Sequence, residues 1–309
     1  MEDEKSRKEK LSTPSGGAGG FVHGFLYLLS LLPLRVLFIF SDLAYVLLYY
    51  VAGYRKKVVF SNLALAFPKK TEEERRQIAK RFYRNFTDNF METVKLFSAD
   101  TRYLNKHFAG DYTVFEQVYQ QGKKSQVHLG HIFNWEMANN TVAANIPQKL
   151  LTLYMPIEAK VFDRLFLKLR TRTGAVMLPA TNIRSALLPW RNSLYSLVLV
   201  ADQSPAVPSN AYWVPFFGRP TPFLKAPENG ARVGNVPVIF SYFVKKKRGY
   251  YQVFFDLVEE SPASLPKGEL TKRFAQYLEQ FITRYPDMWL WSHRRWKWEW
   301  KEEYGPVVQ

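Results

Sequence analysis

Residues 125–136, which read SQVHLGHIFNWE, hold the transition that decides the fold. The first five residues form a strand-like apolar run, and Gly130 then permits a turn. Asn134 is a residue type that commonly caps a helix, so we expect a helix to begin there. A short strand that turns into a helix is the repeating unit of an α/β protein.

The same alternation continues along the chain. The apolar runs LLTLYM, AVML and SLYSLVLVA are separated by helical patterns that begin near Glu158 and Arg184. Two later runs, VPVIFSYFV and YYQVFFDLV, are joined by KKKRG and are typical of a hairpin. We therefore predict an α/β fold in which a mixed sheet is layered with helices.

Residues 71–97 predict a long helix ahead of this sheet. Thr71 and Glu74 have the spacing of a capping box, in which each side chain bonds the backbone of the other residue. Apolar or aromatic residues recur every four positions, which indicates one buried stripe. The stripe consists of Ile78, Phe82, Phe86, Phe90 and Val94.

The apolar segment 21–54 predicts contact with lipid. No small-residue cleavage site follows it, so it is typical of a retained membrane anchor rather than of a secretory signal. Pro33 and Asp42 interrupt it, which leaves open a single spanning helix or an interfacial pair of helices. A hairpin buried in the core is the alternative that needs no lipid.

Three segments follow from these patterns. Residues 1–20 are rich in Ser, Gly and charge, which predicts a disordered tail, and residues 21–54 form the membrane anchor. Residues 55–309 form one catalytic domain, because no linker or internal repeat divides them. The basic residues 55–57 favour the cytoplasmic face for that domain.

Composition narrows the kinds of partner and site. The chain has 43 Lys and Arg against 27 Asp and Glu, a net charge of +16. That charge favours nucleic acid, an anionic membrane face, phosphorylated substrates or an acidic carrier protein. The absence of cysteine excludes disulfides, thiolate nucleophiles and zinc–thiolate sites. There is no G-x-S-x-G, H-E-x-x-H or phosphate loop, so we expect neither a metal nor a cofactor.

His131 and Glu136 are the candidate catalytic pair. On one continuous helix they would face about 140° apart, so the geometry needs a break between them. With His131 in a loop and Glu136 in the first helical turn, the carboxylate can fold back onto one imidazole nitrogen. Such a base can take a proton from a hydroxyl that attacks a thioester. The motif alone is common by chance, and a structural histidine is an equal alternative.

Six blocks in order carry a family resemblance. They read YRKKVVFSNLALAFP, GHIFNWE, FDRLFLKLRTRTG, ADQSP, YWVPFFGRPTPFLKAPENGAR and PDMWLWSHRRWK. The chain resembles the late (secondary) acyltransferases of lipid A biosynthesis, within the glycerolipid-type acyltransferases that share a His-x4-Asp/Glu motif. The resemblance implies an α/β fold, with His131 as general base and Glu136 as its partner.

The resemblance also implies substrate-binding positions. Guanidinium groups suit phosphate, and a lipid A precursor is phosphorylated. Asp202 follows the run SLVLVA, so it lies at the carboxyl end of a strand, where α/β sheets bind ligands. An ordinary turn and solvated surface charges are the alternatives. The positions are Arg170, Arg172, Asp202, Gln203, Arg219 and Lys225.

The expected reaction is O-acyl transfer. The resemblance implies an acyl-acyl carrier protein as donor and a phosphorylated glycolipid, a lipid A precursor, as acceptor. It also implies an anionic membrane surface at the bacterial inner membrane, and no nucleic acid. Another glycolipid, a lysophospholipid or a pigment remains possible as acceptor. A non-enzymatic basic protein that binds membranes or nucleic acid is the alternative from another class.

Five tryptophans crowd residues 289–300, interleaved with basic residues. Amphipathic rings beside cations suit the headgroup level of a membrane or the bases of single-stranded nucleic acid. The resemblance favours lipid. A terminal strand packed in the core is the structural alternative.

Overall fold

The computed structural model describes residues 18–308 of the chain. Its centre is a seven-stranded sheet. In spatial order the strands are β1 (Phe108–Gly110), β9 (Tyr250–Glu259), β8 (Val238–Lys247), β2 (Ser125–Leu129), β5 (Tyr195–Val200), β3 (Lys149–Tyr154) and β4 (Val176–Pro179). Neighbouring strands are parallel except β8 and β9, which are antiparallel, so the sheet is mixed. The predicted fold class is therefore confirmed.

The segment on which the prediction rested folds as expected. β2 covers residues 125–129, and α8 (Trp135–Asn145) begins directly after Asn134. The Asn134 side chain accepts a hydrogen bond of 3.2 Å from the backbone N–H of Met137, which caps the helix. The predicted hairpin is formed by β8 and β9, with Gly249 at a φ of +79° in its turn.

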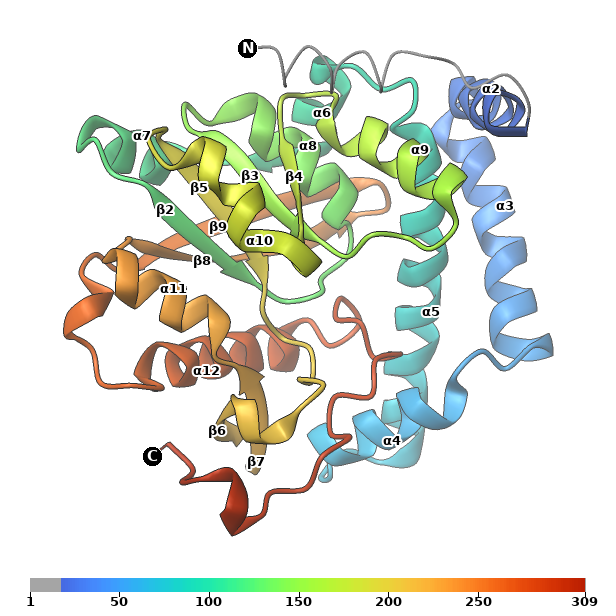
Figure 1. Cartoon of the computed structure of the whole chain (residues 1–309). Helices are drawn as coiled ribbons and strands as arrows, with labels where there is room; N and C mark the ends of the chain where they lie inside the picture. The colour runs from blue at the N-terminus through green and yellow to red at the C-terminus, as the bar shows by residue number, and fades with distance from the viewer. Residues whose placement is uncertain (1–17, 309) are drawn as a thin grey trace.

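Helices cover both faces of the sheet (Figure 1). Because side chains alternate along β2, Val127 packs with residues of α7 (Thr113–Gln120) and α8, whereas His128 lies beside Phe274 of α12 (Glu269–Arg284). These and the remaining helices of the domain are α6 (Thr101–His107), α7 (Thr113–Gln120), α9 (Lys160–Thr171), α10 (Ile183–Leu187), α11 (Ala226–Gly234) and α12 (Glu269–Arg284).

A small second sheet and several short turns complete the domain. The two antiparallel strands of that sheet are β6 (Ala211–Phe216) and β7 (Arg219–Leu224). The short 3₁₀ turns are η2 (Ala180–Asn182), η3 (Leu188–Trp190), η4 (Pro208–Asn210), η5 (Pro262–Ser264) and η6 (Glu302–Tyr304).

The predicted long helix is α5 (Glu72–Lys95), which follows α4 (Lys56–Ala66). Its capping box is confirmed, since Thr71 Oγ1 and Glu74 Oε2 each accept a backbone hydrogen bond, at 3.2 and 2.7 Å. The predicted stripe is only half correct, because Ile78 and Phe82 are buried whereas Phe90 is 49% exposed. An α-helix repeats every 3.6 residues, so a spacing of four drifts off the buried face.

The N-terminal helices pack on one side of the domain. α2 (Ala18–Leu31) and α3 (Leu34–Val46) are separated by Pro33, and the π-helical turn η1 (Leu47–Val51) follows. Figure 1 shows α3 lying alongside α5. Residues 18–20, predicted as tail, begin α2, and residues 1–17 of that tail lie outside the described part of the chain.

One face of the N-terminal helices is open to solvent. Residues 34–51 are long and apolar enough to cross a membrane, and only 28% of that window is buried. The alternative of a buried core hairpin is therefore wrong, and the segment is a candidate membrane anchor. The large apolar side chains left exposed include Ile39, Phe40, Leu43, Val46, Leu47, Tyr50 and Val51.

Two of the five C-terminal tryptophans are core residues. Trp289 and Trp291 are 1% and 0% exposed, and Trp289 packs edge-on against both Trp291 and Phe216. Arg295, which we expected at the headgroup level, is also fully buried and lies over the Phe223 ring. The prediction that this cluster faces lipid is wrong for these residues, because Trp289 packs against β6, Arg295 against β7 and Trp291 against Trp289 and Phe67.

Candidate active site

His131 lies in the loop between β2 and α8, as predicted. Gly130 allows a close approach, because a Cβ there would lie 2.7 Å from Leu278 Cδ1 and 3.1 Å from Asp202 Oδ2. This close approach lets the loop backbone rest on Asp202. Asp202 follows β5, the parallel neighbour of β2, so the two residues meet at the carboxyl ends of adjacent strands.

Asp202 holds the imidazole of His131. Its Oδ1 lies 2.5 Å from His131 Nδ1, and its Oδ2 accepts from His131 N at 2.8 Å and from Trp289 Nε1 at 2.6 Å. Burial alone would raise the pKa of Asp202, but the charge and hydrogen bonds of His131 and the bond from Trp289 lower it to about 2. The buried carboxylate is therefore ionised at neutral pH.

An ionised Asp202 fixes the tautomer of His131. The carboxylate can only accept, so in the neutral imidazole Nδ1 carries the proton and Nε2 has the lone pair. Nε2 lies 2.9 Å from Gln203 Nε2, whose amide N–H donates to it. The His131 side chain is 25% exposed, whereas Asp202 is 2% exposed. Nε2 is therefore a basic nitrogen at the partly exposed edge of the ring. Nδ1, on the other side of the ring, is hydrogen-bonded to the buried Asp202.

Glu136 does not contact the imidazole. Its carboxylate pairs with Arg170 of α9, with Arg170 Nη2 at 2.6 Å from Oε1 and Nε at 2.9 Å from Oε2. The prediction that the Glu136 carboxylate contacts the His131 imidazole is therefore wrong. The first turn of α8 points Glu136 toward α9, and Asp202 already occupies Nδ1. The carboxylate is 3% exposed, and its bidentate partner satisfies it.

Arg172, the family's expected substrate contact, also binds protein. Its guanidinium donates to the backbone carbonyls of Leu96 and Ala99, at the C-terminal end of α5. Burial lowers the pKa of Arg172. Arg172 therefore binds the backbone at the C-terminal end of α5 and forms no hydrogen bond with His131.

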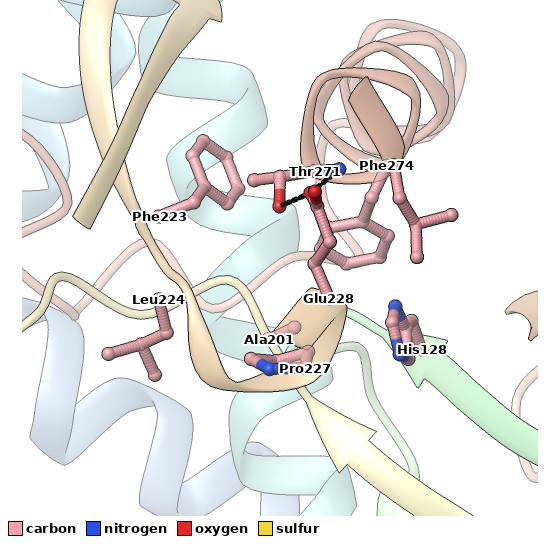
Figure 2. A pocket seen from close by; sticks show the side chains of 9 residues that line it. His128, Ala201, Phe223, Leu224, Pro227, Glu228, Thr271 and Phe274 are labelled. Atoms are coloured by element: carbon pink, nitrogen blue, oxygen red, sulfur yellow. Dashed lines mark hydrogen bonds between the residues drawn. The ribbon is translucent and has the colours of Figure 1, made fainter. Parts of the chain in front are cut away.

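Arg219 and Lys225 lie on the β7 side of the domain, apart from His131. Arg219 is exposed, and the Lys225 ammonium lies over the Tyr212 ring, 5.5 Å from its centre. Between β7 and α12, Glu228 points to Thr271, whose hydroxyl donates to it at 2.7 Å (Figure 2). Glu228 also accepts from the backbone N–H groups of Gly268 and Thr271, at 2.5 and 2.9 Å, so it caps the start of α12.

Three supporting residues were not expected at the site: the sequence predicted Trp289 and Arg295 at the headgroup level and His293 as a structural residue. Trp289 donates to Asp202, the neutral His293 accepts from Ser204 N at 3.1 Å, and Arg295 O accepts from Ser204 Oγ at 2.5 Å. Burial lowers the pKa of His293 to about 4, so it is neutral at pH 7 and able to accept. The block PDMWLWSHRRWK contains all three residues and was the sequence signal for them. In the structure it forms hydrogen bonds with Asp202 and with Ser204 in the same loop.

Glu92 of α5 supports the other side of the His131 loop. Its Oε2 accepts from Asn134 Nδ2 at 2.8 Å and from Tyr251 Oη at 2.6 Å. Its Oε1 has no hydrogen-bond partner among the described residues, and the side chain is fully buried. Burial outweighs the nearby Lys245 charge and raises the pKa of Glu92 to about 7.

Glu92 is expected to make stability depend on pH. Because the pKa is raised from 4.5 to about 7 on folding, the stabilisation is complete below 4.5 and is lost as the pH rises through 7. The loss is about 3 kcal/mol in the free energy of unfolding. Thermal unfolding of wild type and Glu92→Gln between pH 4.5 and 8 measures it. The variant should gain on wild type as the pH rises, and parallel curves would contradict the assignment.

Comparison with known proteins adds the family. The model of the bacterial lipid A biosynthesis acyltransferases matches residues 4–298, nearly the whole chain. The chain belongs to this family. No curated protein matches it. The resemblance drawn from the six blocks is therefore confirmed, and the alternative of a non-enzymatic binding protein is wrong.

Membership of the lipid A biosynthesis acyltransferases defines the chemistry that the site must serve. An O-acyltransferase needs a base for the acceptor hydroxyl and a polar environment for the oxyanion that follows. The His131 imidazole and the Gln203 amide lie side by side at the carboxyl ends of β2 and β5. Among residues 18–308 there is no group of three or more His, Cys, Asp or Glu side chains placed to hold a metal ion.

Proposed function

We propose that this acyltransferase moves a fatty acyl group from an acyl-acyl carrier protein thioester to a hydroxyl of a lipid A precursor. The observation that carries the proposal is the pairing of His131 Nδ1 with the ionised Asp202 at 2.5 Å. In the neutral ring this pairing places the proton on Nδ1 and the lone pair on Nε2, at the partly exposed edge of the ring. A base in that state can accept the proton of an alcohol as the alcohol attacks.

The reaction then follows from the two ring nitrogens. The acceptor hydroxyl replaces the Gln203 amide at Nε2, gives up its proton there and bonds through oxygen to the thioester carbon. Asp202 stabilises the imidazolium that forms. When the tetrahedral intermediate collapses, the carbon–sulfur bond breaks, and the imidazolium returns the proton to the leaving thiolate of the carrier.

Gln203 is our candidate for a substrate contact. Its amide nitrogen lies 2.9 Å from the base nitrogen, so it is close to where the carbonyl oxygen must pass. Once displaced by the hydroxyl, the amide N–H has no other partner among the described residues and can donate to the oxyanion. Glu136 and Arg170 join α8 to α9, and we assign them the positioning of the loop that carries His131.

The membrane association that we propose is interfacial. Asp42, in the middle of the apolar window, pairs with Arg248 in the β8–β9 turn, at 2.6 Å. A spanning α3 would carry this pair into hydrocarbon, which is costly. Helices α2 and α3 instead lie in the interface, with their exposed apolar side chains in the membrane. We place the enzyme on the cytoplasmic face of the bacterial inner membrane, because residues 55–57 are basic.

The test is acyl transfer by the purified protein in mixed micelles. We expect transfer from an acyl-acyl carrier protein to a lipid A precursor, and at least a tenfold lower kcat/KM for a lysophospholipid acceptor. The second readout is mass spectrometry of lipid A from cells with and without the gene. We expect the two lipid A samples to differ by one acyl chain. Unchanged lipid A together with faster transfer to the lysophospholipid would overturn the acceptor assignment.

A further inference from the structure

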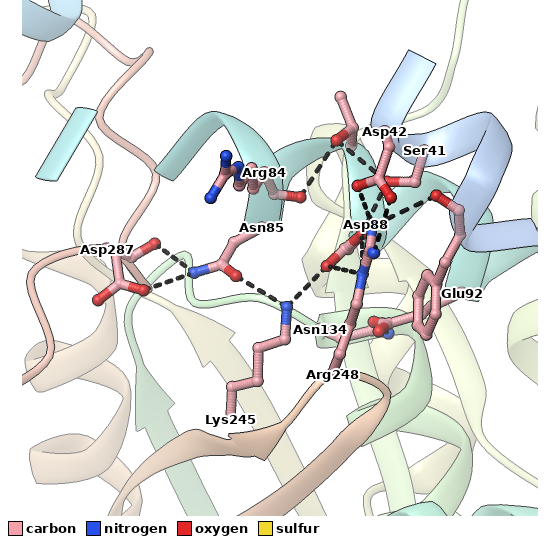
Figure 3. Close-up of polar contacts among 12 residues, drawn as sticks. Ser41, Asp42, Arg84, Asn85, Asp88, Glu92, Asn134, Lys245, Arg248 and Asp287 are labelled. Atoms are coloured by element: carbon pink, nitrogen blue, oxygen red, sulfur yellow. Dashed lines mark hydrogen bonds and ion pairs between the residues drawn. The ribbon is translucent and has the colours of Figure 1, made fainter. Parts of the chain in front are cut away.

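A charged cavity lies between the anchor helix α3, helix α5 and the β8–β9 hairpin, away from His131. Its volume is about 630 Å³. Figure 3 shows the polar side chains that surround it. The residues that line it and carry the argument are Val46, Arg81, Arg84, Asp88, Lys245 and Arg248.

Most of the acidic charge in this cavity is already neutralised. Asp88 accepts from Lys245 Nζ at 2.7 Å and from Arg248 Nη2 at 2.6 Å, and Arg248 also pairs with Asp42. Burial would raise the pKa of Asp88, but the bonds from Arg248 and Lys245 hold it below its usual value. Asp287 accepts from Asn85 Nδ2 at 2.8 Å and is the remaining acid of the lining.

Arg81 and Arg84 are cations without an acidic partner. Both are exposed, and neither guanidinium forms an ion pair or hydrogen bond with another described residue. They are three positions apart on α5, so they lie on the same face of the helix. The Arg84 guanidinium lies 5.0 Å from the centre of the Tyr45 ring, and Figure 3 shows it turned away from the Asp88 network. Lys245 and Arg248 balance Asp88 and Asp42. Arg81 and Arg84 together with Asp287 therefore leave the lining with one net positive charge.

The cavity opens beside the apolar face of the anchor. Val46 lines the cavity and is 45% exposed, next to the exposed side chains of Leu43 on α3 and Leu47 on η1. A lipid with its chains along this face would bring its headgroup to the arginines. Guanidinium groups bind phosphate oxygens through paired, charge-assisted hydrogen bonds.

We propose that Arg81 and Arg84 form a binding site for the phosphate of an anionic lipid headgroup, with the acyl chains against α3. This proposal depends on one part of the proposed function, the placement of α3 at a membrane. The segment behind the cavity also supports the catalytic loop, since Met288 O accepts from Phe133 N at 3.1 Å and Trp289 donates to Asp202. A headgroup bound here orients the His131 side of the domain relative to the membrane.

The experiment is vesicle co-sedimentation of the full-length, detergent-purified protein. Vesicles are phosphatidylcholine alone or phosphatidylcholine with phosphatidylglycerol. The double variant Arg81→Gln/Arg84→Gln is compared with Lys123→Gln/Lys267→Gln, which removes the same charge from exposed positions outside the cavity. We expect the first variant to bind the anionic vesicles roughly thirtyfold more weakly than wild type. The second should stay within about threefold of wild type, and none should differ on phosphatidylcholine alone.

Two results would overturn the proposal. An equal loss of binding in both variants would mean that the attraction is general surface charge. Stabilisation of wild type by inorganic phosphate in detergent, without a preference for anionic vesicles, would make the site one for free phosphate. Because binding is measured without acyl transfer, failure here leaves the catalytic proposal intact, and failed transfer with normal binding contradicts only that proposal.

Discussion

His131→Ala is expected to lower kcat for acyl transfer by about 10²-fold to 10⁴-fold, the usual contribution of a general base. The loss follows from the geometry, because Nε2 is the unprotonated ring nitrogen beside Gln203, 2.9 Å from its amide. The KM for the acyl carrier thioester should change little, since no proton is transferred when the donor binds. Single-turnover transfer from purified acyl-acyl carrier protein measures the chemical step directly.

The alanine variant needs a companion, because it leaves Asp202 buried without its main partner. An unpaired buried charge costs about 3–5 kcal/mol, so loss of activity could reflect unfolding. His131→Asn keeps an amide donor near Asp202 Oδ1 and removes the base. We expect it to unfold close to the wild-type temperature and to be equally inactive. More than a tenth of wild-type kcat in a folded His131→Asn enzyme would remove His131 from the mechanism.

The local part of the site could be predicted from the sequence. Gly130, His131 and Asn134 follow one another, and each is placed by a short-range rule about turns and helix caps. The structure has the strand, the loop and the capped helix at those residues. The prediction succeeded because the cap that starts the helix is local, from Asn134 to Met137, although Asp202 and Glu92 also hold the loop from distant parts of the chain.

The partner of His131 could not be chosen by the same rules. Asp202 lies 71 positions further along, and it reaches the imidazole because β5 pairs with β2 in the sheet. The sequence placed Asp202 at a strand end, but it does not state which strands are neighbours. Glu136 was favoured because it is near in the chain, whereas the helix turns it toward Arg170.

The basic and aromatic residues show a second limit. Arg172 and Arg84 are the same residue type, yet one binds backbone carbonyls at a helix end and the other faces a cavity. Tryptophans beside arginines suit a membrane surface, but Trp289 and Trp291 lie in the core. Composition gives the chemistry of such side chains, and only packing decides what they face.

Asp202→Asn is expected to lower kcat by about 10³-fold to 10⁴-fold, because it reverses the tautomer of the base. The carboxylate Oδ2 accepts two N–H groups, from His131 N and Trp289 Nε1. In the variant the amide oxygen must stay there, so the amide nitrogen takes the place of Oδ1 and donates to Nδ1. The proton of the imidazole then moves to Nε2, which becomes a donor and cannot accept the acceptor hydroxyl's proton.

Glu136→Gln is the matched control, since it is the same change in the carboxylate that the family motif favours. Its amide still bonds Arg170, so kcat should fall at least tenfold less than in Asp202→Asn, and its main effect should be a lower unfolding temperature. The imidazole ¹⁵N chemical shifts of His131 separate the two roles: Asp202→Asn should move the proton from Nδ1 to Nε2, and Glu136→Gln should not. A tautomer change in Glu136→Gln but not in Asp202→Asn would mean that Glu136 orients the His131 imidazole. A residue that only joins α8 to α9 could not move the imidazole proton from one ring nitrogen to the other.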